Sequence, residues 1–150
     1  MIWIPFILLD ERCRPLKAHE TDAGFDLTSR EDALLEPSQT KRVPVGVKIA
    51  LPPGYEAQVR PRSSWSSQGV FVAFGTVDAS YRGEIQVVVF NSTPNSLAIL
   101  AGTRIAQLVV SSLAAIRFQV AETLDTTERG EDGFGSSGVQ AFRRSEGRDE

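Results

Sequence analysis

The chain has 150 residues, of which 16 are Lys or Arg and 19 are Asp or Glu, so its formal net charge is −3. This balance excludes a broad basic surface, and we therefore expect no direct binding of nucleic acid. Its hydrophobic share of 41% is enough for one domain to build a core without disulfides.

Cys13 is the only cysteine of the chain, which excludes an internal disulfide and a Cys-rich zinc site. A lone thiol fits a reducing compartment. The flanking residues Arg12 and Arg14 can lower the pKa of a thiol, but we expect a bystander thiol rather than a nucleophile. The only histidine, His19, has no partner for a catalytic pair or a zinc site, so we interpret it as a surface residue.

Residues 1–9 are apolar but short, and no positively charged region or small-residue cleavage site accompanies them. We interpret them as a first strand with Pro5 at an edge or bulge, and not as a signal peptide. No apolar run approaches the length of a transmembrane helix. We expect a cytoplasmic protein without a membrane partner.

Short apolar runs with alternating or β-branched residues continue along the chain, separated by Gly and Pro turns. The further strands that we expect are 25–28, 42–51, 55–60, 69–74, 85–90, 97–100, 105–110 and 116–120. The turn signal Pro52-Pro-Gly54 predicts a hairpin of strands 42–51 and 55–60. Residues 63–68 are the best helix candidate. Many short strands predict an all-β fold, either a sandwich or a barrel.

The composition changes near residue 126, where glycine, serine and charged residues replace the apolar runs. We expect a β-domain of residues 1–125 and an arm of residues 126–150 that is mobile in the free protein. Phe134 stands among the glycines and serines of this arm. A large apolar side chain in such a segment indicates a role beyond that of a linker.

Residues 75–85 lie between two expected strands and hold a turn. Asp78 and Tyr81 would point to opposite faces of a straight strand, but a turn can aim both into one pocket. A carboxylate beside an aromatic ring can act as a general base next to a platform for a flat ligand. The alternative is an Asp that caps backbone amides beside a half-buried Tyr, with Gly83 supplying backbone freedom.

Four further polar segments each have a functional and a structural interpretation. Residues 129–138 combine an arginine, glycines and two serines in a composition suited to a phosphate cradle, or they form a Gly/Ser linker. The structural alternatives elsewhere are a helix cap at 61–64, a turn at 23–27, and an ion pair with an edge amide at 104–107.

In this order, five segments resemble the five motifs of the trimeric dUTPase family, the deoxyuridine triphosphate nucleotidohydrolases. The segments are Ala23-Gly-Phe-Asp-Leu27, Pro61-Arg-Ser-Ser64, Gly75-Thr-Val-Asp-Ala-Ser-Tyr-Arg-Gly83, Gly102-Thr-Arg-Ile-Ala-Gln-Leu108 and Arg129-Gly-Glu-Asp-Gly-Phe-Gly-Ser-Ser-Gly138. The resemblance covers nearly the whole chain, from about residue 2 to 138. It implies a distorted jelly-roll-like β-barrel or sandwich, assembled as a homotrimer with active sites at the subunit interfaces.

The resemblance also implies hydrolysis of dUTP to dUMP and pyrophosphate, which limits uracil in DNA and supplies dUMP for dTMP synthesis. It makes Asp78 the base that activates water for in-line attack on the α-phosphorus. One chain would supply Asp78 and the sugar-packing Tyr81, a second chain the triphosphate site, and a third its arm as a lid with Phe134 over the uracil ring.

The resemblance implies one substrate-binding set, drawn from all five motifs and the strand after the third. Its members are Arg62, Ser63, Ser64, Gly75, Val77, Tyr81, Ile85, Gln86, Gln107, Arg129, Phe134, Gly135, Ser136 and Ser137. The implied cofactor is Mg²⁺, which bridges the phosphates and is reached by Asp26 through coordinated water.

The chain departs from the family's usual motifs at four positions, none of which removes a catalytic group. Ser64 stands where the family usually has Gly, Thr103 where it has Asp, and Asp132 where Gly is common. Trp65 is bulkier than the usual aliphatic residue. An extra carboxylate near a triphosphate is unfavourable unless it points away or meets Arg129.

Three other functions remain open from the sequence. A dCTP deaminase-type relative would use a glutamate base within a different central motif. A nucleotide-gated binding module would keep the fold and control a partner protein. A purely structural β-barrel subunit would explain none of the five motifs.

Overall fold

The computed structural model describes residues 1–133 of the chain. Contacts divide the chain into a first unit, Met1–Ala115, and a second unit, Ile116–Glu150. The predicted boundary after residue 125 stays a prediction. The strands are β1 (Phe6–Leu8), β2 (Phe25–Thr28), β3 (Ala33–Leu35), β4 (Thr40–Pro44), β5 (Val47–Ile49), β6 (Tyr55–Arg60), β7 (Val70–Val72), β8 (Gly75–Val77), β9 (Gln86–Asn91), β10 (Leu97–Ile99) and β11 (Arg104–Ser112). The helices are the 3₁₀ turn η1 (Glu11–Cys13) and α1 (Ser63–Ser66).

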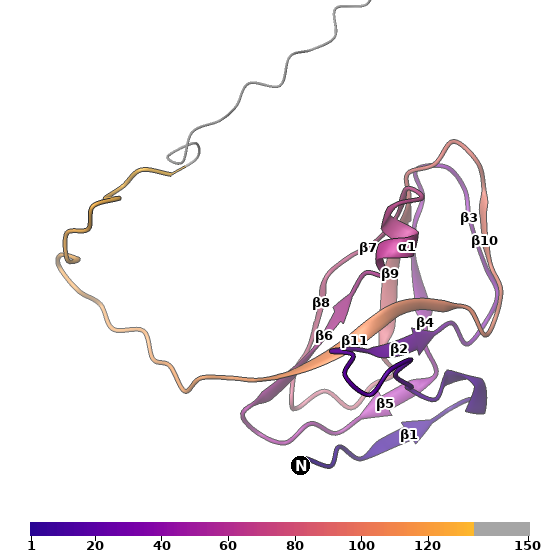
Figure 1. Cartoon of the computed structure of the whole chain (residues 1–150), viewed down its shortest axis with the longest axis horizontal. Helices are drawn as coiled ribbons and strands as arrows, with labels where there is room; N and C mark the ends of the chain where they lie inside the picture. Colours follow the sequence, from indigo (N-terminus) through magenta and orange to yellow (C-terminus); the bar gives the residue numbers. More distant parts are fainter. Residues whose placement is uncertain (134–150) are drawn as a thin grey trace, which may run out of the picture. The chain divides into compact units, whose positions relative to one another are not determined.

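Antiparallel strands build the first unit (Figure 1). One sheet has the order β2-β11-β6-β8 and a second the order β4-β9-β7, while β1 pairs with β5 and β10 pairs with β3. Strands far apart in the sequence are therefore neighbours, as in Greek-key and jelly-roll folds. The predicted all-β, jelly-roll-like fold is confirmed.

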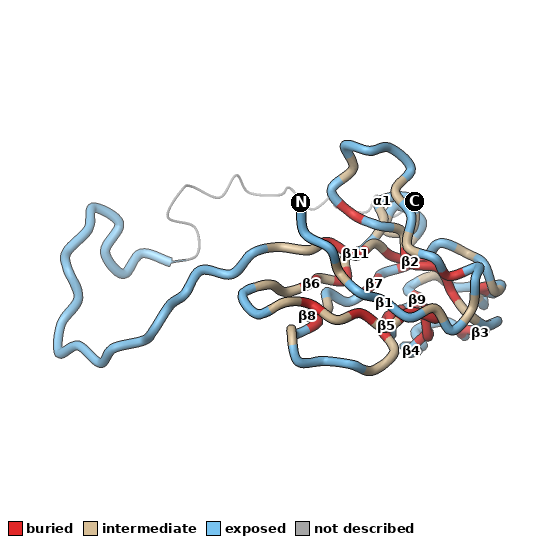
Figure 2. The backbone as a smooth tube through the Cα atoms, turned by 90° about the horizontal axis from the view of Figure 1, so that it is seen from below, coloured by how far each residue is buried: buried red, intermediate tan, exposed pale blue. Residues whose placement is uncertain are grey.

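Buried residues lie along most of the strands of the first unit (Figure 2), and their apolar side chains form one core cluster. Strand β9 shows the alternation clearly, because Val87 and Val89 are fully buried while Gln86 and Phe90 are exposed. A period of two residues places alternate side chains on opposite faces of a strand. Trp65 of α1 and Val110 of β11 pack against the same core from partly exposed positions.

Asn91 is the largest polar residue at 0% exposure, and it joins two loops to the end of β9. Its Nδ2 donates to the carbonyl oxygens of Leu35 at 3.1 Å and Asn95 at 2.8 Å. Its Oδ1 accepts from the Thr93 amide at 3.0 Å and hydroxyl at 2.8 Å. These bonds compensate the loss of hydration that burial of the amide requires.

The predicted hairpin of strands 42–51 and 55–60 is wrong. The first segment is two strands, because Gly46 has a φ of +65° and interrupts the extended chain between β4 and β5. Strand β4 then pairs with β9, β5 with β1, and β6 with β11 and β8. The turn after residue 51 exists, but its flanking strands belong to different pairs.

Several predicted boundaries also change. The N-terminal strand is limited to β1, with Pro5 before it. Strands β3 and β8 were not predicted, because each has only three residues and too short a pattern to recognise. Residues 116–120 alternate as a strand does, yet they form none, since within the described chain no strand edge pairs with them.

The predicted helix at 63–68 is confirmed as the single turn α1, which ends at Ser66 with Ser67 at the C-cap. Gly69, in the turn that follows, has a φ of +79°. The alternative role of Ser63 or Ser64 as a helix cap is wrong. Arg62 occupies the N-cap position, and no side-chain hydrogen bond caps this end. His19 is exposed, as predicted.

Cys13 lies at the end of η1 and is 1% exposed. Burial raises the pKa of its thiol above the ordinary value of 9.0, and this effect outweighs the lowering by Arg12. The Sγ atom donates to the Thr28 carbonyl oxygen at 3.4 Å. The expected bystander thiol agrees with this environment, and activation by the flanking arginines does not occur.

The second unit, from Ile116, is described as far as residue 133. It contains a turn in which the amide of Gly130 donates to the Thr127 carbonyl oxygen at 3.1 Å, and the amide of Asp132 donates to that of Arg129 at 3.1 Å. Apolar side chains in this stretch are exposed, including Phe118 at 99%. In the part of the chain that the structure describes, no helix is long and apolar enough to span a bilayer.

The buried thiol leads to a labelling prediction. Native protein at pH 8 should not react with a thiol reagent such as DTNB, while urea-unfolded protein should release one equivalent. A His19→Cys variant, exposed in its turn, should react in the native state and serves as the control. The raised folded pKa also means that ionisation of Cys13 in the unfolded chain lowers stability as the pH rises past 9.0. Rapid native labelling of Cys13 would contradict this account.

Candidate functional site

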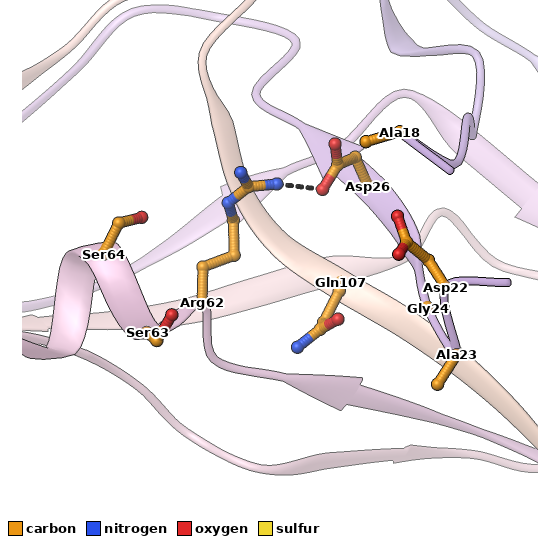
Figure 3. A pocket seen from close by; sticks show the side chains of 9 residues that line it. All are labelled: Ala18, Asp22, Ala23, Gly24, Asp26, Arg62, Ser63, Ser64 and Gln107. Atoms are coloured by element: carbon orange, nitrogen blue, oxygen red, sulfur yellow. Dashed lines mark hydrogen bonds and ion pairs between the residues drawn. The ribbon is translucent and has the colours of Figure 1, made fainter. Parts of the chain in front are cut away.

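A polar pocket of about 300 Å³ lies where β2, β11 and the start of α1 meet (Figure 3). It contains members of three of the recognised segments. Its lining consists of Ala18, Asp22, Ala23, Gly24, Asp26, Arg62, Ser63, Ser64 and Gln107. We call it the carboxylate pocket, because Asp22 and Asp26 both contribute to it.

The Asp26 carboxylate lies between two arginines, of which Arg62 lines this pocket. One carboxylate oxygen pairs with Nη1 of Arg62, and the other accepts from Nη1 of Arg104 at 3.1 Å. The Asp26 side chain is only 17% exposed, so two guanidinium groups compensate for its partial burial. The ion pair that the structural alternative for residues 104–107 named therefore exists, with Asp26 as the partner of Arg104.

Gln107 reaches the pocket from the central strand β11. Its Nε2 donates to the Pro61 carbonyl oxygen at 3.0 Å, which joins β11 to the segment before α1. Gln107 pairs with Asp26 on one side and Arg60 on the other, so it is not the edge amide of the structural alternative. Gly24 leaves space for this side chain, because a Cβ there would lie 2.6 Å from Oε1 of Gln107.

A second pocket, of about 350 Å³, lies beside β8 and the turn that follows it. Polar and apolar side chains from four strands meet there. They are Arg42, Val59, Gly75, Thr76, Val77, Asp78, Tyr81, Ile85, Gln86 and Val88. We call it the turn pocket. It contains every predicted site residue of the third segment and the strand after it.

The turn itself brings Asp78 and Tyr81 into one pocket. The amide of Tyr81 donates to the Asp78 carbonyl oxygen at 3.0 Å, and the Tyr81 hydroxyl donates to the Glu84 carbonyl oxygen at 2.9 Å. Arg82 fastens the same turn through Nη1, which donates to the carbonyl oxygens of Ala79 at 2.6 Å and Tyr81 at 2.7 Å. Within residues 1–133, no hydrogen bond or ion pair engages the Asp78 carboxylate. A free carboxylate at a fixed position can accept a proton.

Gly83 has a steric role in this turn. A Cβ at Gly83 would overlap the hydroxyl and ring of Tyr81. Its φ is not among the positive values of the described chain, so backbone freedom is not the reason for glycine. The absence of a side chain lets the Tyr81 ring lie against the turn.

The two pockets share no lining residue, so one chain separates the predicted site into two parts. Arg62, Ser63, Ser64, Gln107 and Asp26 line one part. Arg129 is exposed in the second unit, where its Nε donates to the Asp132 carbonyl oxygen at 2.9 Å. Phe134, Gly135, Ser136 and Ser137 lie outside the described residues.

Several lining residues were missed by the sequence analysis. Asp22 was not among the expected site residues, although it is a second carboxylate in the first pocket. Arg42 and Val88 are cross-strand partners on β4 and β9, and both line the turn pocket. Only the pairing of these strands could have revealed them, since residues 42 and 88 are far apart in the sequence.

The departures at Ser64 and Thr103 are accommodated locally. Ser64 lies within α1, and the only non-glycine residue with positive φ among residues 1–133 is Ser38, so this turn does not require glycine. Thr103 takes part through its backbone, because its carbonyl oxygen accepts from the Ser29 amide at 2.8 Å.

Charge makes the carboxylate pocket a poor anion site by itself. Asp22 and Asp26 outnumber its one lining arginine, Arg62, and would repel a triphosphate. One or two carboxylates beside phosphate oxygens are the donors with which Mg²⁺ is held in phosphoryl-transfer sites. The donor set therefore fits a magnesium ion held mainly by phosphates. No cluster of three or more metal-binding side chains is present within residues 1–133.

Comparison with known sequences matches residues 12–138 to the sequence model of the dUTPase family. This chain belongs to the dUTPase family. A deoxyuridine 5'-triphosphate nucleotidohydrolase of Bifidobacterium longum is 52% identical over 126 residues, which cover 81% of this chain and 80% of the relative. The same enzyme of Clostridium kluyveri is 43% identical over 132 residues, which cover 86% and 92%.

A solved dUTPase has the same fold. A mutant of the Staphylococcus bacteriophage 80alpha dUTPase with dUpNHpp gives a TM-score of 0.86 at 30% identity, covering 93% of this chain and 100% of the phage chain. The dUTPase of S. aureus phage phi11 gives a TM-score of 0.78 at 24% identity over 83% of this chain and 100% of that one, and a mutant of it is described with a structural Mg(II) ion.

The contact of Gly24 with Gln107 predicts a stability effect. Gly24→Ala should force the Gln107 amide away from Pro61 and lower the free energy of unfolding by about 1–3 kcal/mol. Urea denaturation followed by fluorescence measures this. Gly75→Ala is the matched control, because its Cβ would lie 3.4 Å from Val59, an ordinary contact, and should cost under about 1 kcal/mol. Equal losses for both variants would contradict the steric argument.

Proposed function

We propose that this protein is a dUTP diphosphatase that hydrolyses dUTP to dUMP and pyrophosphate. The observation that carries this proposal is the similarity to nucleotidohydrolases of this name along most of the chain, at 52% identity for the B. longum relative. The two pockets supply the chemistry that such a reaction requires. A dCTP deaminase and a purely regulatory module are not favoured, because the relatives are hydrolases and the Asp78 turn is intact.

Asp78 is the proposed general base. Its carboxylate accepts a proton from a water molecule, whose oxygen attacks the α-phosphorus in line. The bond from the α-phosphorus to the oxygen bridging to the β-phosphorus breaks, and pyrophosphate leaves with that oxygen. The hydrogen bonds of Tyr81 and Arg82 hold the backbone of this turn, so the base needs little reorganisation during the reaction.

The turn pocket is the proposed nucleoside site. The Tyr81 ring packs under deoxyribose and leaves no room for a 2′-hydroxyl group. The strand backbones at Gly75, Val77, Ile85 and Gln86 face the uracil edge, where donors and acceptors mismatch cytosine and a narrow wall excludes the thymine methyl group. Ile85 is 2% exposed, which supports a rigid floor for this pocket.

The carboxylate pocket is the proposed triphosphate site, with Arg62, Ser63, Ser64 and Gln107 as ligands. Arg129 and the arm residues Phe134, Gly135, Ser136 and Ser137 are proposed to close over the bound nucleotide, in agreement with the match of the family to residues 12–138. Arg129 adds a positive charge that the pocket lacks.

Magnesium is the proposed cofactor, with Asp26 as its protein partner through coordinated water. When bound, the ion would neutralise phosphate charge and orient the leaving group. Asp26 keeps its carboxylate at a fixed place through Arg62 and Arg104. Arg62, which pairs with Asp26 in this structure, would be the cation in the lining of this pocket that binds a phosphate oxygen.

The assembly that we propose is a homotrimer with shared sites. The base in the turn pocket and the ligands in the carboxylate pocket share no lining residue in one chain, which supports a site completed by a second copy. An apolar surface supports association, because the cross-strand partners Phe71 and Phe90 are 47% and 37% exposed and Phe74 is 61% exposed. The buried free thiol fits the proposed cytoplasmic location.

A substrate panel tests the activity. Protein with Mg²⁺ should release pyrophosphate from dUTP, and little from dCTP, dTTP or UTP, while ammonia release from dCTP should be absent. Asp78→Asn should lower turnover by about 10³-fold or more with binding of a non-hydrolysable dUTP analogue nearly intact, because only proton transfer is removed. Near-normal turnover by this variant would disprove the role of Asp78, and no pyrophosphate from wild-type protein would disprove the activity.

Mixed assemblies test the shared site. Asp78→Asn removes the proposed base from the turn pocket. An Arg62→Ala/Gln107→Ala double variant removes two proposed triphosphate ligands from the carboxylate pocket. Coexpression at equal levels should restore about a quarter of wild-type sites, because only sites that draw Asp78 and the triphosphate ligands from different, complementary copies are intact. A mixture no more active than its parts would contradict shared sites and favour a site within one chain.

A further inference from the structure

Glu84 follows the Asp78 turn, and no step of the proposed reaction uses its side chain. The side chain is only 16% exposed. Its Oε1 accepts a hydrogen bond from the Gly46 amide at 2.8 Å and lies 3.1 Å from Nε of Arg30. One oxygen of the Glu84 carboxylate therefore contacts a backbone donor between β4 and β5 and a cation between β2 and β3.

Steric contacts and backbone hydrogen bonds fix the segment around the Gly46 amide. Gly46 has a φ of +65°, and a Cβ there would lie 2.7 Å from the buried Sγ of Cys13, so no side chain fits. On either side of it, the Val45 amide donates to the Ile85 carbonyl oxygen at 3.2 Å, and the Ile85 amide donates to that of Val47 at 3.0 Å. The Glu84 carboxylate adds a third bond between this segment and the end of the turn.

The ion pair with Arg30 adds an electrostatic attraction to the Glu84–Gly46 hydrogen bond. Its Nε is buried and has no hydrogen-bond partner within the described residues, so the ion pair with Glu84 is its compensation. The Arg30 amide donates to the Pro44 carbonyl oxygen at 2.9 Å, which fixes its backbone beside the same segment. Removing the carboxylate would leave this buried Nε–H without a partner, although the Arg30 side chain as a whole is 36% exposed.

The backbone carbonyl of Glu84 contacts the turn that carries Asp78 and Tyr81. Its carbonyl oxygen accepts from the Tyr81 hydroxyl at 2.9 Å, and the Tyr81 amide donates to the Asp78 carbonyl oxygen at 3.0 Å. The contacts run from Arg30 and Gly46 through Glu84 and Tyr81 to Asp78. A displacement of Glu84 would therefore move both the tyrosine and the proposed base.

We propose that Glu84 is a positioning residue that sets the places of Tyr81 and Asp78 by anchoring the turn to Gly46 and Arg30. The inference rests on the proposed dUTP hydrolysis. It assigns to Glu84 two measurable effects, on turnover through Asp78 and on selection of dUTP over UTP through Tyr81. Glu84 itself does not contact the nucleotide.

The test compares Glu84→Ala, Glu84→Asp and Glu84→Gln in the full chain with Mg²⁺. Glu84→Ala should lower kcat for dUTP by about 10- to 100-fold, more than it raises KM, and lower the ratio of kcat/KM for dUTP over UTP by about 10-fold. Glu84→Asp keeps the charge but is one methylene shorter, so it should lower the ratio too. Glu84→Gln keeps an acceptor for the Gly46 amide and should retain the ratio within about 3-fold.

Glu11→Ala is the matched control, because Glu11 forms an exposed ion pair with Arg14 at 3.0 Å away from both pockets. It should leave all values unchanged. The dUTP/UTP ratio does not depend on the folded fraction, so a merely structural role would lower activity on both nucleotides equally. Should Glu84→Ala fail to fold, the Glu84→Asp variant decides. An unchanged ratio in the folded variants overturns the proposal.

Hydrogen exchange without nucleotide separates this inference from the proposed function. The amides of residues 79–85 should exchange faster in Glu84→Ala or Glu84→Asp than in wild type and Glu11→Ala. Unchanged exchange overturns the anchor whatever the activity. Wild-type protein that does not hydrolyse dUTP overturns the reaction and the catalytic part of this inference, while the exchange rates still decide whether Glu84 anchors the turn.

Discussion

The pairing of β11 with β2 on one side and β6 on the other is the constraint on which both pockets depend. In this register Gln107 lies between Asp26 and Arg60, so a row of polar side chains crosses a sheet whose other face is apolar. Strand β6 continues the sheet to β8, where Val77 pairs with Ala57 just before the Asp78 turn. One set of backbone hydrogen bonds thus positions both parts of the proposed site.

The separation of these parts follows from the geometry of a sheet. Asp26 lies on β2 and Asp78 just after β8, and these are the two outer strands of the four-stranded sheet. Strands β11 and β6 therefore lie between them, each about 5 Å from its neighbours. The proposed association of copies would bring the two parts together, and it would also cover apolar side chains such as Phe71, which a single chain leaves exposed.

Charge and rigidity are distributed unequally between the two pockets. The carboxylate pocket has an excess of negative charge, which Arg62 and Arg104 reduce around Asp26. This arrangement suits a site whose anionic ligand brings its own divalent cation. In the turn pocket, bonds from Tyr81, Arg82 and Glu84 hold the backbone, and the Asp78 carboxylate is not paired within residues 1–133. Such a division suits a reaction that needs charge neutralisation at the phosphates and a fixed base beside the sugar.

Local chemistry predicted the all-β class, the helix at 63–68 and the turn at Asp78, because alternation of apolar residues and turn residues act over a few positions. The five motifs, read by resemblance, pointed to the family, and four of them supplied lining residues of the two pockets. Pairing partners were not predictable from local patterns, and residues 42–51 show why: Gly46 splits them, and the two halves find β9 and β1 far away in sequence. The roles of Arg42 and Glu84 likewise depend on contacts across the sheets. Tertiary structure decides these features. The stabilisation by a strand pair or a partly buried ion pair depends on two segments that are distant in the sequence, so the local pattern of either segment does not predict it.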